Sequence, residues 1–293
     1  MAKAWDRSPF TYSAGTHETT EVALTSTSTY SAALIDPQRW SGRDLTEASV
    51  RYTRHGANPS DVAFSGEASL GAISASRFGF GPGRGAYSRA VASLSRTVQS
   101  TGGRTVGYAR LFASYAPNAP REREVYASAS DPTSSFGDDL WRPRGGVLAP
   151  GRETEVPFGY RTLADGHYRP LGGAALRGYD PRLVFGSGAA VNLEEAVRLT
   201  TLAGPASGLA LYASVFGDAG LRSLPKLRAL DRSLGNGALA DAGPSVSVRG
   251  QLYDREVRVR ADFPLFVRGL GVGDDARVSG ARFRFAFSLD DLW

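Results

Sequence analysis

Residues 281–289 read Ala-Arg-Phe-Arg-Phe-Ala-Phe-Ser-Leu, a stretch near the end of the chain in which every second residue is apolar. Successive side chains of an extended strand point to opposite faces, so Phe283, Phe285 and Phe287 share one face. The last residue, Trp293, stands in phase with these three phenylalanines. The stretch therefore predicts a C-terminal strand with one apolar and one mostly polar face.

Two upstream stretches alternate in the same way. One has its apolar phase at Val257, Val259, Ala261, Phe263, Leu265 and Val267. The other has apolar Leu209, Leu211, Ala213 and Val215 in one phase and Tyr212, Ser214, Phe216 and Asp218 in the opposite one. Segments of about 9–11 residues are long enough to cross a bilayer as tilted strands. Weaker alternation at 47–52 and 107–114 predicts further strands earlier in the chain.

The composition excludes several classes of protein. No run approaches the roughly 18 unbroken apolar residues of a membrane helix, although 42% of the residues are hydrophobic. The absence of Cys excludes a disulfide scaffold and Cys-based metal sites. The net charge of +5 comes from scattered arginines, whereas nucleic-acid binding needs a clustered basic face. Nucleic acid is therefore not a predicted partner.

The predicted connections alternate in length. Short turns are expected at 203–208 and near Tyr253-Asp254, and longer connections at 160–186, 219–243 and 268–280. Short turns on one rim and long loops on the other are typical of outer-membrane β-barrels, whose last strand often ends in an aromatic girdle. The alternative is a soluble β-rich protein, whose strands alternate in the same way but bury the apolar face. The turn pattern and Trp293 favour the membrane barrel.

Few residues suggest catalysis or the binding of a metal or cofactor. The three histidines are far apart and in no metal-ligand spacing. The glycine-rich stretch 80–85 lacks the ending of a phosphate loop, and we interpret it as a turn. Glu194 and Glu195 point to opposite faces of a strand, so they do not converge as catalytic carboxylates. We expect no enzyme activity, no metal and no cofactor.

Two details do not follow the simple strand pattern. Leucines recur at helical spacing between Pro225 and Gly235, which predicts a short amphipathic helix in the 219–243 connection. Glu195 shares its phase with Leu193 and Val197, which places a carboxylate on the apolar face. Either it lies near a membrane interface or a bulge shifts the register.

A motif in the third quarter of the chain carries a family resemblance. Residues 171–180 read Leu-Gly-Gly-Ala-Ala-Leu-Arg-Gly-Tyr-Asp, and their Leu-Arg-Gly-Tyr core resembles the sixth-loop motif of the bacterial surface-antigen superfamily of BamA/TamA-type barrels. The companion F-x-D-x-G motif of that family is similar to Phe216-Gly217-Asp218-Ala219-Gly220. The resemblance extends from about residue 125 to the C-terminus and implies an in-folded loop whose Arg177 pairs with Asp218.

Physical chemistry supports this pairing. Asp218 shares its phase with Tyr212 and Ser214, which in a barrel face the lumen. A buried charge needs a partner, and a guanidinium matches a carboxylate through two hydrogen bonds. Gly178 permits a close approach to the wall. Tyr179 is expected to stack or hydrogen-bond in the lumen, or to be an ordinary loop aromatic.

The predicted fold is a single all-β domain over residues 1–293, a transmembrane antiparallel β-barrel of roughly 12–14 strands, with 16 possible. Residues 1–124 contribute strands by their pattern only. The family usually carries periplasmic POTRA domains, and we expect none in this chain.

The predicted location is the bacterial outer membrane, with membrane lipid and envelope proteins as partners. The resemblance implies a role in insertion or translocation of protein or lipid, or as anchor and conduit for a periplasmic domain or partner. A simple outer-membrane pore or transporter and a soluble β-rich binding protein are the alternatives.

Overall fold

The structure, a computed structural model, describes residues 17–27, 43–56, 61–74, 85–128, 173–179, 183–202, 209–224, 237–252, 255–269 and 284–289. These residues form β1 (His17–Thr27), β2 (Asp44–His55), β3 (Val62–Ser74), β4 (Gly85–Gln99), β5 (Thr105–Tyr115), the 3-10 turn η1 (Arg121–Arg123), β6 (Ser187–Thr201), β7 (Ala210–Ser223), β8 (Gly237–Leu252), β9 (Arg255–Asp262), β10 (Phe266–Gly269) and β11 (Arg284–Leu289).

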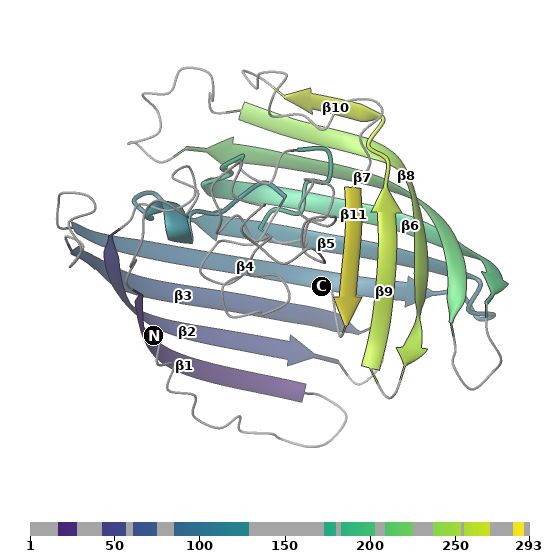
Figure 1. Cartoon of the computed structure of the whole chain (residues 1–293), viewed down its shortest axis with the longest axis horizontal. Helices are drawn as coiled ribbons and strands as arrows, with labels where there is room; N and C mark the ends of the chain where they lie inside the picture. The colour runs from purple at the N-terminus through teal and green to yellow at the C-terminus, as the bar shows by residue number, and fades with distance from the viewer. Residues whose placement is uncertain are drawn as a thin grey trace, which may run out of the picture.

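All the strands belong to one antiparallel sheet. They follow one another in chain order from β1 to β9 and then β11, while β10 pairs with β8. The sheet is strongly curved, with β9 and β11 crossing in front of the strands at the back (Figure 1). In the described part, β1 and β11 do not pair with each other, so the sheet is open between its edges. The all-β antiparallel fold is confirmed, whereas closure and a total of 12–14 strands stay predictions.

The connections alternate in length, as the sequence predicts. β2, β4, β6 and β8 are each followed by a short connection, and β4 and β6 end on the right of Figure 1. The turn after β4 is held by Gly103, which is at a φ of 61° and donates to the Ser100 carbonyl at 2.7 Å. The predicted 219–243 connection is wrong at both ends, because β7 runs to Ser223 and β8 begins at Gly237. The alternation of outward apolar and inward polar side chains continues to the end of β7, where Leu221 points outward and Arg222 points inward.

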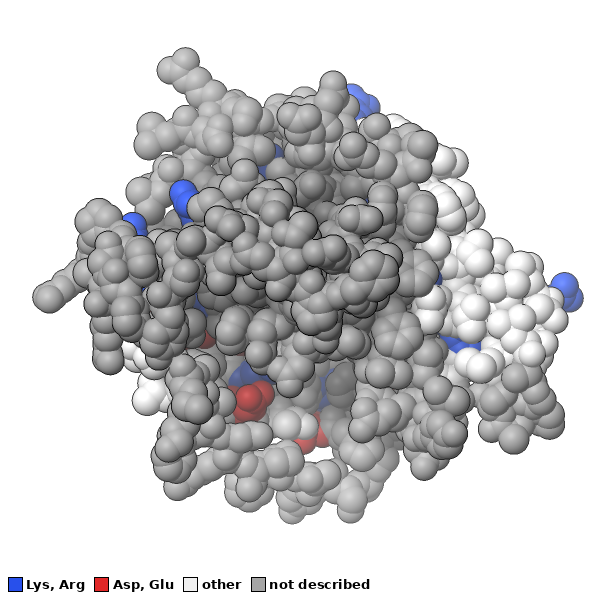
Figure 2. Space-filling view, in the orientation of Figure 1, with Lys and Arg blue, Asp and Glu red and all other residues white. Residues whose placement is uncertain are grey.

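The polarity of the sheet is the reverse of that in a soluble β-protein. Large apolar side chains point away from the concave side, and Leu70, Val215 and Leu221 are 69%, 63% and 66% exposed. The buried polar side chains of the strands include Glu47, Ser69, Arg89, Asn192, Glu194, Ser214, Asp218, Arg222, Asp241, Ser245, Ser247, Arg260 and Asp262. In Figure 2 the visible acidic side chains lie beside basic ones in a hollow at lower centre.

The concave side is filled by chain from the long connection between β5 and β6. We call residues 116–128, 173–179 and 183–186 the plug. Its parts bind each other: Leu176 N–H donates to the Ala127 carbonyl at 2.7 Å, and Phe185 N–H donates to the Val125 carbonyl at 2.7 Å. Plug side chains such as Leu176 and Phe185 share one buried cluster with Tyr87, Phe112 and Leu239 of the wall. The plug is therefore a packed unit inside the sheet.

The predicted continuous phase from Val257 to Val267 is wrong. Asp262 opposes Ser245 and Phe266 opposes Ala242, so one extra residue is inserted around Pro264. Proline has no N–H for the ladder, which makes a bulge the natural place for it. The insertion turns Phe266 outward, while Val267 packs against the buried cluster.

Other predictions fall partly outside the described residues. β11 pairs with β9 and sets Phe285 opposite Ala261 and Phe287 opposite Val259. Phe283, Trp293, the helix predicted between residues 225 and 235, and most of the turn at 80–85 lie outside the described residues. Within the described ranges, no helix has the length and apolar character needed to cross a membrane.

Candidate functional site

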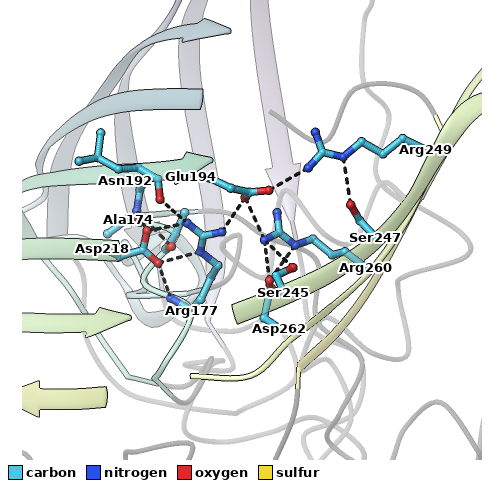
Figure 3. A network of polar contacts seen from close by, with 12 residues as sticks. Ala174, Arg177, Asn192, Glu194, Asp218, Ser245, Ser247, Arg249, Arg260 and Asp262 are labelled. Carbon is cyan, nitrogen blue, oxygen red and sulfur yellow. Dashed lines mark hydrogen bonds and ion pairs between the residues drawn. The ribbon is translucent and has the colours of Figure 1, made fainter. Parts of the chain in front are cut away.

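Arg177 is fully buried at the centre of a polar network between the plug and the wall (Figure 3). It belongs to the plug turn 173–179. Its Nε and Nη2 donate to the two carboxylate oxygens of Asp218 on β7 at 2.8 and 2.9 Å. Its backbone N–H also donates to Asp218 Oδ2, at 3.2 Å. Two parallel bonds between a guanidinium and a carboxylate are the strongest form of this pair, and they set its orientation.

Three further groups complete the surroundings of the Arg177 guanidinium. Nη1 donates to Glu194 Oε2 at 2.8 Å, and Nη2 donates to the Leu193 carbonyl at 3.2 Å. The guanidinium carbon lies 4.0 Å from the ring centroid of Phe216, a cation–π contact. Burial by itself lowers the pKa of Arg177, but the carboxylates of Asp218, Asp262 and Glu194 together outweigh it, and the net pKa is raised. Arg177 therefore stays charged.

Asn192 on β6 joins this carboxylate to the backbone of the plug. Its Nδ2 donates to Asp218 Oδ1 at 3.1 Å and lies 3.2 Å from the carbonyl oxygens of Ala174 and Ala175. Arg110 on β5 donates to Asn192 Oδ1 at 3.2 Å and to the Gly173 carbonyl at 3.0 Å. These contacts fix the turn that carries Arg177. Sequence reasoning missed Asn192, although it shares the inward phase of Glu194.

Glu194 extends the network across the concave side. Arg249 on β8 and Arg260 on β9 approach its two oxygens at 2.8 and 3.0 Å. Arg260 Nε donates to Asp262 on the same strand at 2.9 Å. Figure 3 shows these side chains converging from the wall onto the carboxylate that also holds Arg177. One plug arginine is thus coupled to strands from β6 to β9.

The other predicted residues lie around this network in different roles. A Cβ on Gly178 would lie 2.7 Å from both Asp241 Cβ and Val267 Cγ2, so glycine allows the plug to touch the wall. The Tyr179 hydroxyl accepts from Ala240 N–H at 2.9 Å and is within bonding distance of the Ala240 and Arg268 carbonyls, so it ties the plug to β8 and β10. A Cβ on Gly220 would lie 2.9 Å from the Phe185 ring, so this glycine makes room for Phe185.

A second cluster, which sequence reasoning missed, holds the other half of the plug. Arg123 of η1 donates to both oxygens of Glu47 on β2 at 2.8 Å and to Glu67 on β3 at 2.7 Å. Arg89 also bonds Glu67, and the Tyr87 hydroxyl donates to Glu47 at 2.5 Å. We call Glu47, Glu67, Tyr87, Arg89 and Arg123 the Arg123 cluster. The only signal in the sequence was the inward phase of Glu47.

Both clusters attach the plug to the wall of the sheet. Guanidiniums of the plug meet carboxylates of the wall, and each is buried with hydrogen bonds that offset its desolvation. Among the described residues, no group of three or more His, Cys, Asp or Glu has the arrangement of a metal site. What the arrangement can do is hold an internal segment in one position and release it when the ion pairs break.

Comparison with known proteins adds little. No protein-family model matches the chain, and no curated protein matches it. Among solved structures, the chain is similar to CdiB from Escherichia coli, with 12% sequence identity and a TM-score of 0.48. The similarity covers 93% of this chain and 40% of CdiB, so the chain spans less than half of that protein's length.

Proposed function

We propose that this protein is an integral outer-membrane β-barrel of the surface-antigen type whose lumen is closed by the plug. It acts in the insertion or translocation of protein or lipid, or as the membrane anchor and conduit of a periplasmic domain or partner. The observation that carries the proposal is the reversed polarity of the sheet, with apolar side chains outside and charges inside. Periplasmic or other envelope proteins and membrane lipid are its expected partners.

The outward face supports a lipid environment. Large apolar side chains are exposed on strands from β1 to β8, from Val22 and Leu24 to Val246. Monomeric soluble proteins rarely expose contiguous apolar patches larger than a few hundred Å². Full burial of one such side chain is worth about 1.5–3 kcal/mol, so water is a poor solvent for this surface. The soluble alternative would need the opposite polarity.

The plug supports regulated rather than constant passage. It is attached at two separated places, through Arg177 to β6 and β7 and through Arg123 to β2 and β3. Each attachment is a buried ion pair, and separating the two charges costs free energy because it leaves a buried charge without its partner. A simple open pore has no use for such a plug. The protein therefore works by shape and gating, with Arg177 and Asp218 as the latch.

Two measurements test this proposal together. The purified protein should change its gel mobility on boiling and should resist extraction from lipid vesicles by urea, as a folded barrel does. In planar bilayers it should show low or flickering conductance that rises when Asp218 is replaced by asparagine. A monomer that stays in solution without detergent would overturn the membrane proposal. A stable open channel in the unmodified protein would instead favour the simple pore.

A further inference from the structure

The outward face carries a groove across β4 to β7, with a volume of about 500 Å³. Its apolar lining includes Val98, Gly107, Ala109, Leu193, Val215 and Gly217. Gly107 and Gly217 leave the groove open because they have no side chain to fill it. The space above them is empty: a Cβ on Gly217 would meet nothing within 4 Å, and one on Gly107 would meet only the Val98 carbonyl oxygen, at 3.8 Å. Leu193 and Val215 stand beside these glycines and are more than half exposed. The groove has the apolar lining that an acyl chain requires.

Two charged side chains line the same groove. Glu195 lies on the outward face opposite Gly107 and Val215, and no described residue forms an ion pair with it. The bulge of β6 lies between Arg198 and Thr200, beyond Glu195, so it does not turn this carboxylate inward. Arg96 on β4 is also exposed and also lines the groove. A carboxylate and a guanidinium therefore face the surroundings of an otherwise apolar surface.

The groove lies close to the rim of short turns. Gly107 is two residues from the start of β5, and Val98 is one residue from the end of β4. This rim is at the right of Figure 1, where the uncovered surface in Figure 2 is mostly uncharged with a few basic side chains at its edge. Charges on the lipid face are tolerated near the membrane interface and not at its centre. In a membrane-inserted barrel, the β4 and β5 side of the groove would reach the depth of lipid headgroups, because Arg96 is three residues from the end of β4 and Glu195 pairs with Gly107 near the start of β5.

We propose that the groove binds a phospholipid with an ethanolamine headgroup, with its ammonium on Glu195, its phosphate on Arg96 and an acyl chain over Gly107 and Gly217. This inference rests on the proposed insertion into a membrane. Arg96 is level with Leu193, two strands away, and Glu195 lies two residues further along β6, which puts the two backbones about 12 Å apart at the usual strand spacing and rise. Both side chains are long enough to flank one headgroup across that distance.

The charges select this headgroup over others. A primary ammonium donates hydrogen bonds to a carboxylate as a lysine does, whereas a quaternary choline nitrogen has no N–H to donate. A glycerol headgroup carries no cation and leaves Glu195 beside a phosphate of like charge. Arg96 alone would accept any phospholipid, so Glu195 is the residue that sets the preference.

The test is lipid retention by the intact, detergent-purified protein. It is incubated with equal amounts of phosphatidylethanolamine, phosphatidylcholine and phosphatidylglycerol with the same acyl chains, and the lipids that remain bound are counted by native mass spectrometry. The unmodified protein should retain phosphatidylethanolamine at least five-fold over the other two. Glu195→Gln should abolish the preference, and Gly217→Leu, which fills the groove, should reduce retention of all three. Glu18→Gln, an exposed carboxylate on β1, is the matched control and should change nothing.

The outcomes separate this proposal from the one it rests on. Gel mobility before and after boiling is recorded for every variant, so a variant that fails to fold is recognised. If the unmodified protein is folded in membranes but retains the three lipids equally, or if Glu195→Gln keeps the preference, the lipid site is refuted while the barrel stands. If a protein, and no lipid, is joined to Glu195 by a carbodiimide in native membranes, the groove is a protein interface and the lipid proposal is wrong. If the protein does not enter membranes, the proposed function fails first.

Discussion

Asp218→Asn removes the charge that holds Arg177 while keeping the size of the side chain. In the structure, Asp218 accepts two bonds from the guanidinium, at 2.8 and 2.9 Å, and others from the Arg177 backbone and Asn192. Removing one partner of a buried ion pair costs about 3–5 kcal/mol. Because Glu194 and the Leu193 carbonyl still hold Arg177, we take the lower end, about 3 kcal/mol. At 1.4 kcal/mol per factor of ten, the released plug should become about 150 times more populated.

Thiol labelling measures this release directly. The chain has no cysteine, so Ala174→Cys in the buried plug turn introduces a single thiol. When opening and closing are fast, the labelling rate follows the open population, so Asp218→Asn should raise the rate by about 150-fold. Glu18→Gln on the exposed edge strand serves as the control and should leave the rate unchanged. Equal rates in the parent, Asp218→Asn and Arg177→Ala proteins would refute the latch.

Three further changes test other parts of the structure. Glu47→Gln should weaken the hold on Arg123 by about 2 kcal/mol and speed labelling at Ala127→Cys, and an unchanged rate there would make the Arg123 cluster irrelevant to plug release. Gly178→Ala should lower thermal stability by about 1–3 kcal/mol through its contacts with Asp241 and Val267, whereas Gly85→Ala, with nothing within 4 Å, should be neutral. Leu70→Arg should lower the free energy of unfolding in lipid vesicles by about 2–4 kcal/mol if the residue lies near mid-membrane. A change under about 0.5 kcal/mol, typical of a water-exposed site, would argue against lipid contact.

The strands in which apolar and polar residues alternate could be predicted directly from the sequence. The opposite phases of Val215 and Asp218 predicted which side chains point inward, and the exposure of these residues confirms that assignment. The predicted alternation held to Leu265 and failed from Phe266 onward, where a one-residue bulge beside Pro264 reversed the direction of the side chains. Periodicity carries no information on such insertions, because a bulge depends on how two strands meet.

The candidate site was predictable where a motif marked it and not elsewhere. The Leu-Arg-Gly-Tyr turn and the F-x-D-x-G strand predicted that Arg177 pairs with Asp218, and the structure places the two side chains in contact. Their role in gating stays a prediction. Arg123 and Glu47 are 76 residues apart and belong to no motif, so only the folded chain brings them together.

The sequence by itself determined that this chain forms two-faced strands joined by alternating short and long connections, because side-chain direction and turn length are local properties. The motif resemblance already implied that the loop carrying Arg177 folds inward, whereas tertiary structure alone decided that residues 116–128 also pack on the concave side of the sheet. It also decided that a second plug arginine, Arg123, meets carboxylates on another part of the wall, Glu47 and Glu67. The physical reason is that a buried charge is stable only where curvature and register place its partner within hydrogen-bonding distance.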